Sequence, residues 1–135
     1  MRYLMMIKAD RDYEAGQPPP PELMAGMAAL TAEMAQAGVL LSAEGLTPSS
    51  QGMRLSWSGG RRTVVDGPFT EAKELVGGFA ILRADSREQA LALAQRVLDV
   101  HIAAGVEDFA MEIRPLYEPM GAATDKPAQA QTTSA

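Results

Sequence analysis

Acid–base chemistry needs a side chain that can exchange a proton near neutral pH, and two residues of this sequence are candidates. His101 is the one histidine of the chain, and a histidine titrates close to that range. Asp66 follows two β-branched residues and precedes Gly67-Pro68, a position at a strand end where a hydrophobic cleft could tune a carboxyl group. Each also has a structural interpretation. An aspartate before Gly-Pro caps a turn by hydrogen-bonding the backbone two residues on, and a histidine in the last turn of a helix interacts favourably with the helix dipole.

Three charged residues follow closely, namely Glu71, Lys73 and Glu74. If the segment from Thr70 to Glu74 forms one helical turn, the two glutamates share a face, and Lys73 can pair with Glu71 or with a residue across a dimer interface. A carboxylate pair beside a lysine can bind a polar ligand or hold a proton. A salt-bridged surface turn is the alternative, in which each ion pair contributes about 0–1 kcal/mol.

Trp57, Arg62 and Arg114 are candidate ligand contacts outside this segment. Strict alternation in Met53–Ser58 predicts a half-buried strand, and the two glycines after it supply a turn that lets residues 61–65 run back alongside. This register places Arg62 against the Trp57 indole, a cation–π contact of about 0.5–1 kcal/mol. The tryptophan is then either a cross-strand packing residue or a surface on which a ligand stacks. Arg114, in the last predicted strand, is a further polar anchor.

Other chemistries have no support in the sequence. One histidine, no cysteine and scattered carboxylates give no metal-ligand spacing, and no phosphate-binding glycine loop occurs, so we expect neither a metal nor a cofactor. A net charge of −5 and a pI near 4.8 argue against direct nucleic-acid binding. The apolar run at the N-terminus is too short for a signal core or a membrane span. We therefore expect a cytoplasmic protein without a membrane partner.

Hydrophobic periodicity predicts six strands and two helices, in the order β-α-β-β-β-β-α-β, for residues 1–118, which form one domain by their number. The predicted helices run from Pro21 to near Gly38 and from the Asp85-Ser86 cap to Gly105. Residues 10–20 are expected to be a loop, and residues 119–135, which lack any periodicity, a disordered tail. The predicted strands are residues 2–9, 39–46, 53–58, 61–65, 75–84 and 109–114.

This order favours an α+β fold, the split βαβ arrangement of ferredoxin-like proteins, with a mainly antiparallel sheet and helices on one face. Strands 2–9 and 75–84 are apolar on both sides, so the second face of the sheet also needs a cover. A second copy of the chain is the simplest cover. We therefore expect a homodimer that forms through the sheet face.

The segment VDGPFTEAKELVGGF, residues 65–79, resembles the signature of the DGPF-domain, or YCII-related, proteins. Three further stretches are similar to the family pattern in the same order, and the resemblance covers roughly residues 2–117. They are RYLMMI at 2–7, GVLLSAEGLTP at 38–48 and EIRPL at 112–116. The resemblance implies a dimeric α/β barrel with two protomers packed sheet against sheet. Relatives by fold include small monooxygenases, lactone isomerases and degradative enzymes with a cleft between sheet and helices.

The resemblance leaves two classes of function. Smaller members of the family are suspected enzymes because of a His–Asp pair; Asp66 matches the aspartate of the signature, whereas His101 lies late in the chain and the family histidine lies early. The expectation is a small-molecule-binding or enzyme-like homodimer with a cleft near the DGPF loop. The alternative is a non-enzymatic accessory or regulatory protein of an extracytoplasmic-function sigma-factor system, with which many members are associated by genome context. A pocket containing Asp66 would favour the first, and an Asp66 bonded only to backbone N–H groups the second.

Overall fold

The computed structural model describes residues 1–71 and 74–118; the predicted disordered tail, 119–135, lies outside the described residues. The main body consists of β1 (Arg2–Lys8), α2 (Pro21–Gln36), β2 (Leu40–Gly45), β5 (Val76–Arg83), α3 (Arg87–Ala103) and β6 (Met111–Pro115). The shorter elements are α1 (Arg11–Glu14), the 3-10 turn η1 (Ser49–Gln51), and the strands β3 (Met53–Ser58) and β4 (Arg61–Asp66). The predicted element order is therefore confirmed, with α1 added where a loop was expected.

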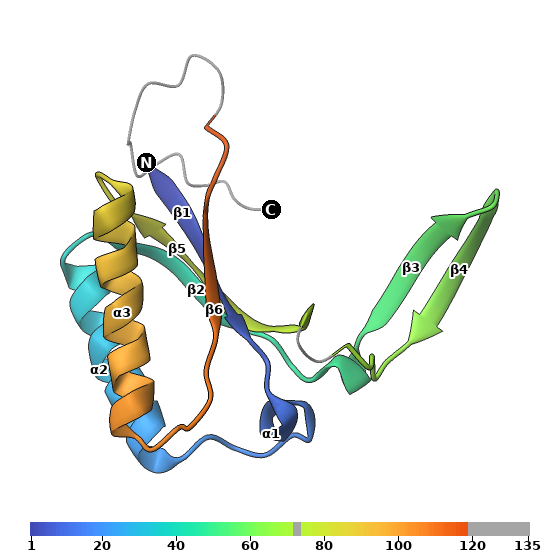
Figure 1. Cartoon of the computed structure of the whole chain (residues 1–135), viewed down its shortest axis with the longest axis horizontal. Coiled ribbons are helices and arrows are strands. Elements are labelled where there is room, and N and C mark those ends of the chain that lie inside the picture. The colour runs from blue at the N-terminus through green and yellow to red at the C-terminus, as the bar shows by residue number, and fades with distance from the viewer. Residues whose placement is uncertain (72–73, 119–135) are drawn as a thin grey trace.

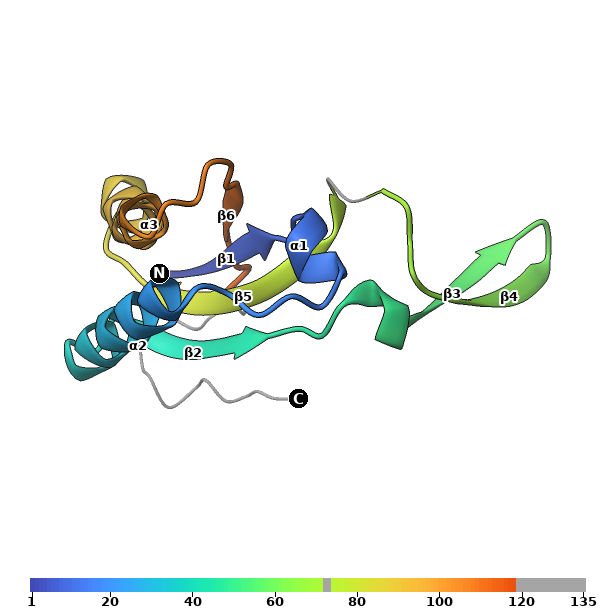
Figure 2. The same cartoon turned by 90° about the horizontal axis from the view of Figure 1, so that it is seen from below.

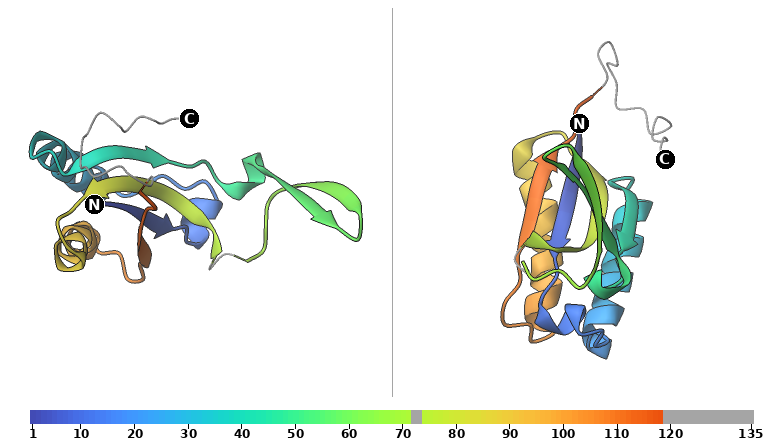
Figure 3. Two further views of the ribbon diagram at one scale, coloured as in Figure 1. Left: turned by 90° about the horizontal axis from the view of Figure 1, so that it is seen from above. Right: turned by 90° about the vertical axis from the view of Figure 1, so that its right-hand side faces the viewer.

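The main sheet has the strand order β2-β5-β1-β6, and each of its three strand pairs is antiparallel. This is the order expected when two βαβ halves interleave, so the predicted α+β, ferredoxin-like class is confirmed. Both long helices lie on the same face of the sheet, as Figures 1 and 2 show. The right-hand view of Figure 3 presents the sheet in front with the helices behind it.

The core lies between this sheet and the two helices. Successive strand residues point to opposite faces, so Tyr3 and Met5 of β1 and Ala80 and Leu82 of β5 face the helices and are buried. The helices contribute small and aliphatic residues to the same cluster. Helix α3 begins where predicted, because the Ser86 hydroxyl accepts a hydrogen bond of 3.0 Å from the Gln89 N–H. The buried helical residues are Leu30, Met34, Ala90, Leu93, Ala94 and Val97.

The second face of the sheet carries the alternate residues of the central strands. Leu4 pairs with Ile81 and Met6 pairs with Phe79, and all four side chains are partly buried. This small apolar area was expected from the two-sided hydrophobicity of these strands. Charged residues of the same strands, among them Arg83, surround it.

The β3–β4 hairpin departs from the prediction of a half-buried strand. Its register is as expected, with Trp57 opposite Arg62 and the guanidinium carbon 5.9 Å from the indole ring centre, and Gly59 and Gly60 both adopt positive φ in the turn. Every residue of both strands is nevertheless exposed. The hairpin forms a separate two-stranded sheet and projects away from the body (Figure 1; Figure 3, left). The alternation thus marks an amphipathic ribbon whose apolar face has no cover among the described elements.

Candidate functional site

A groove of about 1360 Å³ opens on the helix side of the sheet. Its walls come from α2, from the C-terminal end of α3, and from the strands β1, β2 and β5. The segment from Asp10 to Pro20, comprising α1 and the prolines after it, lies along one side. The groove is large enough for a small organic molecule, since ligand pockets commonly measure about 300–1,000 Å³.

Local sequence fixes the course of two segments around the groove. Gly26 allows α2 to approach α3 closely, because a Cβ at this position would lie 2.8 Å from Cγ1 of Val100. Pro18 to Pro20 are restricted to extended backbone, and Pro20 has φ −59° and ψ 148° just before α2 begins. This stretch therefore runs along the groove instead of folding into it.

The floor of the groove is rich in flexible apolar side chains. Met34 is buried in the core, whereas Met24 is 57% exposed, and both line the groove. Thioether side chains are unbranched and adapt to the shape of a bound molecule. The apolar lining residues include Met5, Ile7, Leu23, Met24, Met27, Leu30, Met34, Leu40, Val97 and Phe109.

His101 is the buried titratable side chain of this wall, with an exposed fraction of 7%. Its Nδ1 lies 2.8 Å from the carbonyl oxygen of Val97, and because a carbonyl only accepts, Nδ1 carries the hydrogen. The ring stacks on Phe109 with 3.8 Å between ring centres and 22° between planes. These two contacts fix the imidazole. Its Nε2 has no hydrogen-bond partner among residues 1–71 and 74–118, so in the neutral ring a lone pair is left for a ligand.

The rim of the groove is mainly acidic. Two basic side chains, Lys8 and Arg11, stand there with five carboxylates. Lys8 is already engaged, since its Nζ lies 3.5 Å from the Glu112 carboxylate. This balance disfavours an anionic ligand. The rim carboxylates belong to Asp10, Asp12, Glu44, Glu107 and Asp108.

Asp66, the other acid–base candidate, stands elsewhere. It is the last residue of β4, pairs with Met53 across the hairpin and is exposed. It does not line the groove, and no described residue donates a hydrogen bond to its carboxylate. The predicted turn cap is absent because the residue two positions on is Pro68, which has no N–H. Asp66 and His101 are thus not brought together in one cavity. Asp66 lies neither in a pocket, which would favour a ligand-binding protein, nor in hydrogen bonds to backbone N–H groups, which would favour an accessory protein.

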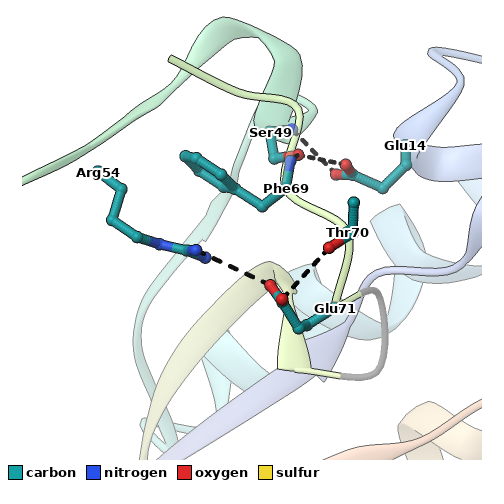
Figure 4. Close-up of polar contacts among 6 residues, drawn as sticks. All are labelled: Glu14, Ser49, Arg54, Phe69, Thr70 and Glu71. Carbon is teal, nitrogen blue, oxygen red and sulfur yellow. Dashed lines mark hydrogen bonds and ion pairs between the residues drawn. The ribbon is translucent and has the colours of Figure 1, made fainter. Parts of the chain in front are cut away.

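The DGPF loop, residues 66–71, is instead held by contacts that the sequence did not reveal (Figure 4). Ser49 of η1 donates its hydroxyl to Glu14 over 2.5 Å and its backbone N–H to the same carboxylate over 2.9 Å. The Ser49 Oγ also accepts a hydrogen bond of 3.0 Å from the Phe69 N–H. Gly67 is required here, because a Cβ would lie 1.8 Å from the carbonyl oxygen of Ser49.

The charged residues after Phe69 complete this arrangement. The Arg54 guanidinium lies 4.0 Å from the centre of the Phe69 ring and 3.8 Å from the Glu71 carboxylate. Glu71 also accepts a hydrogen bond of 3.2 Å from the Thr70 hydroxyl. The Glu74 N–H donates to the Glu71 carbonyl over 2.9 Å, while Lys73 lies outside the described residues. Glu71 therefore has a structural partner on the hairpin.

The remaining candidates also lie outside the groove. Trp57 and Arg62 meet each other on the projecting hairpin, as predicted. Arg114 is exposed on β6 with its guanidinium 3.7 Å from Glu112. Neither the hairpin nor residues 66–71 contribute to the groove wall, which reaches only the flanking residues Pro48 and Gly77.

Tyr13 lines the groove but is not among the predicted site residues, because the sequence predicts a loop where α1 forms. Asp10 caps this helix by accepting a hydrogen bond of 2.7 Å from the Tyr13 N–H. The Tyr13 hydroxyl then donates to the Gly77 carbonyl over 2.6 Å. The backbone approaches closely at the next residue, since a Cβ on Gly78 would be 3.1 Å from the Glu44 carbonyl oxygen. An aspartate three residues before a tyrosine in an acidic stretch was the available signal for α1.

Two kinds of site are not found in the part of the chain that is described. No group of three or more histidine, aspartate or glutamate side chains is placed to hold a metal ion within residues 1–71 and 74–118. Among the same residues, no helix has the length and apolarity needed to cross a membrane.

Comparison with known proteins gives two similarities. The family model for the YCII-related domain matches residues 1–112. An uncharacterized protein of Rhizobium meliloti (strain 1021) is 31% identical over 99 residues, which cover 72% of this chain and 77% of the relative. The matched range includes α1, both long helices, the hairpin and the DGPF loop.

Proposed function

We propose that this chain, which belongs to the YCII-related domain family, binds a small organic molecule in the groove beside His101 and does so as a homodimer. The single observation that carries the proposal is a buried imidazole on the groove wall, fixed through Nδ1 and with Nε2 left without a partner among the described residues. A fixed base with one free nitrogen can orient a ligand or transfer a proton. Binding alone and catalysis are both compatible with this arrangement.

The lining indicates the chemical class of the ligand. Methionine and leucine side chains favour a molecule with an apolar body, and the free Nε2 favours a hydroxyl or other hydrogen-bond donor on that body. The acidic rim favours neutral or cationic molecules over anions. We therefore propose a neutral or cationic, largely apolar ligand that carries at least one donor group.

The site test is a thermal-shift screen of neutral, cationic and anionic metabolites against the wild type and two variants. His101→Asn keeps a side-chain N–H that can reach the Val97 carbonyl and removes Nε2, so any ligand that stabilises the wild type should lose at least about tenfold in affinity, the equivalent of about 1.4 kcal/mol. Asp66→Asn is the matched control and should bind normally. If the binding of a ligand depends on Asp66 and not on His101, the site lies at the DGPF loop and the proposal is wrong.

The proposed dimer rests on the second face of the sheet. Leu4, Met6, Phe79 and Ile81 form an apolar area at its centre, while the helices lie on the other face (Figure 3). Packing of two such faces would bury this area between protomers.

A non-enzymatic accessory or regulatory role, for example in an extracytoplasmic-function sigma-factor system, is the second candidate. It is favoured by the engagement of the loop that carries the family signature, in which Gly67, Phe69 and Glu71 all have structural partners. If the metabolite screen gives no ligand while a purified sigma factor encoded beside this protein binds it, the second role replaces the first.

A further inference from the structure

The apolar face of the β3–β4 hairpin has no cover in the protomer. In antiparallel pairing, Met53, Leu55 and Trp57 of β3 share one face with Val64 of β4. These four side chains are 71%, 70%, 68% and 62% exposed. The strands pair with each other and with no other described strand. A lone two-stranded hairpin is marginally stable in water, and an apolar stripe of this kind marks an interaction surface.

The opposite face of the same hairpin is polar. It carries Arg54, Ser56 and Ser58 on β3 and Thr63 on β4, with Val65 of β4 as its apolar residue. Arg54 is already engaged by Phe69 and Glu71 at the base. The hairpin therefore presents one face for burial and one face for solvent.

The charges at the two ends of the apolar face identify the partner. The face is built of three cross-strand rungs: Met53 with Asp66 at the base, Leu55 with Val64 in the middle, and Trp57 with Arg62 at the tip. Consider a two-fold axis that lies over the middle rung, halfway between two facing hairpins, and runs perpendicular to the strands and parallel to the sheets. This axis places the base rung of one hairpin over the tip rung of the other. Asp66 then lies opposite the Arg62 of a second copy, and Met53 lies opposite its Trp57. Both contacts are favourable, the first by charge and the second by sulfur–aromatic packing.

We infer that this face is an isologous interface, on which the hairpins of two copies of the chain pack antiparallel, face to face. The middle rungs of the two copies, each with Leu55 and Val64, meet at the two-fold axis. The hairpin projects clear of the main sheet, so this contact does not use the area around Ile81 (Figure 1). This interface would explain why the alternating pattern of β3 predicts burial although the strand is exposed in the single protomer.

The chain has no cysteine, so single cysteines can test this geometry directly. Packed sheets lie about 10 Å apart, too far for a disulfide, so the reagent is a bis-maleimide with a spacer of about that length. Leu55→Cys, on the apolar face, should cross-link to a covalent dimer at least about fivefold faster than the control Ser56→Cys, on the opposite face. Equal rates for the two variants would overturn the inference.

A charge exchange in the Leu55→Cys background tests the antiparallel orientation. Arg62→Asp alone, or Asp66→Arg alone, places like charges opposite each other and should lower the cross-linking rate at least about tenfold. The double exchange restores opposite charges and should recover the rate to within about twofold, whereas Arg61→Asp, on the polar face, should leave it unchanged. Single exchanges without effect, or a double exchange that fails to recover the rate while circular dichroism is unchanged, would refute the two-fold arrangement.

Discussion

At the scale of single residues, His101 and Gly67 show how position decides the use of a side chain. The imidazole is held from two sides, by the Val97 carbonyl and the Phe109 ring, so Nδ1 is engaged and only Nε2 is left for a further hydrogen bond. Gly67 is selected for the absence of a side chain, because the Ser49 carbonyl occupies the place of its Cβ. The aspartate before it has neither kind of constraint among the described residues.

Gly67→Ala tests the close contact beneath the DGPF loop. The added methyl group would meet the Ser49 carbonyl oxygen at 1.8 Å, so the loop must shift, and we expect a loss of about 1–3 kcal/mol in the free energy of unfolding. Urea denaturation followed by circular dichroism measures this loss. Gly45→Ala is the control, because no atom lies within 4 Å of its Cβ position; an equal effect of both substitutions would contradict the prediction.

At the scale of elements, α1 and η1 connect the groove to the hairpin. Asp10 to Tyr13 line the groove, and the next residue, Glu14, holds Ser49 and through it the DGPF loop. Figures 1 and 2 show α1 between the main body and the hairpin. Glu14 and Ser49 thus link α1 by hydrogen bonds to the DGPF loop at the base of the hairpin.

A double-mutant cycle measures this connection. Ser49→Ala removes the hydroxyl that bonds both Glu14 and Phe69, and Glu14→Gln removes the charged carboxylate that accepts from Ser49. Each substitution should lower the free energy of unfolding by about 1–3 kcal/mol. Because the two changes break one network, their sum should exceed the double-mutant loss by about 0.5–3 kcal/mol. Amide hydrogen exchange at residues 53–66 should rise in both variants. Strict additivity of the two losses would show that the residues act independently.

The local sequence pattern was sufficient to predict most helices and strands, but it did not predict which of their residues are exposed or which distant segments they contact. The order of strands and helices, the Ser86 cap and the Trp57–Arg62 register all depend on residues close in the sequence, and all were predicted. The exposure of the hairpin, the groove and the Ser49–Glu14 contact depend on segments far apart in the chain, such as 14 and 49. For the same reason, the sequence predicts a site at Asp66 from its place in the family signature, whereas it cannot show that the groove lies beside α2 and α3.

At the scale of the whole molecule, the sheet has one face covered by helices and a second face with an apolar centre. We expect light scattering to give at least twice the chain mass of 14.4 kDa for the wild type at micromolar concentration: twice through the sheet face alone, and more where the hairpins also associate. Ile81→Asp should reduce the association through this face, because it places a charge at the centre of the interface. Ile102→Asp, at a residue that is 59% exposed on α3, is the matched control and should leave the mass unchanged. A wild type that remains monomeric would contradict the sheet-face dimer.

The place at which the hairpin is inserted has a consequence for how such a chain can diversify. β2 and β5 are adjacent, and their ladder continues past Gly45, because the Leu46 N–H donates to the Gly77 carbonyl. The thirty or so residues between these points leave and rejoin the domain at neighbouring positions, so their length does not affect strand order. Evolution can therefore shorten, extend or recharge this excursion without altering the architecture from which it departs, so a change in the proposed hairpin interface need not change the proposed ligand groove.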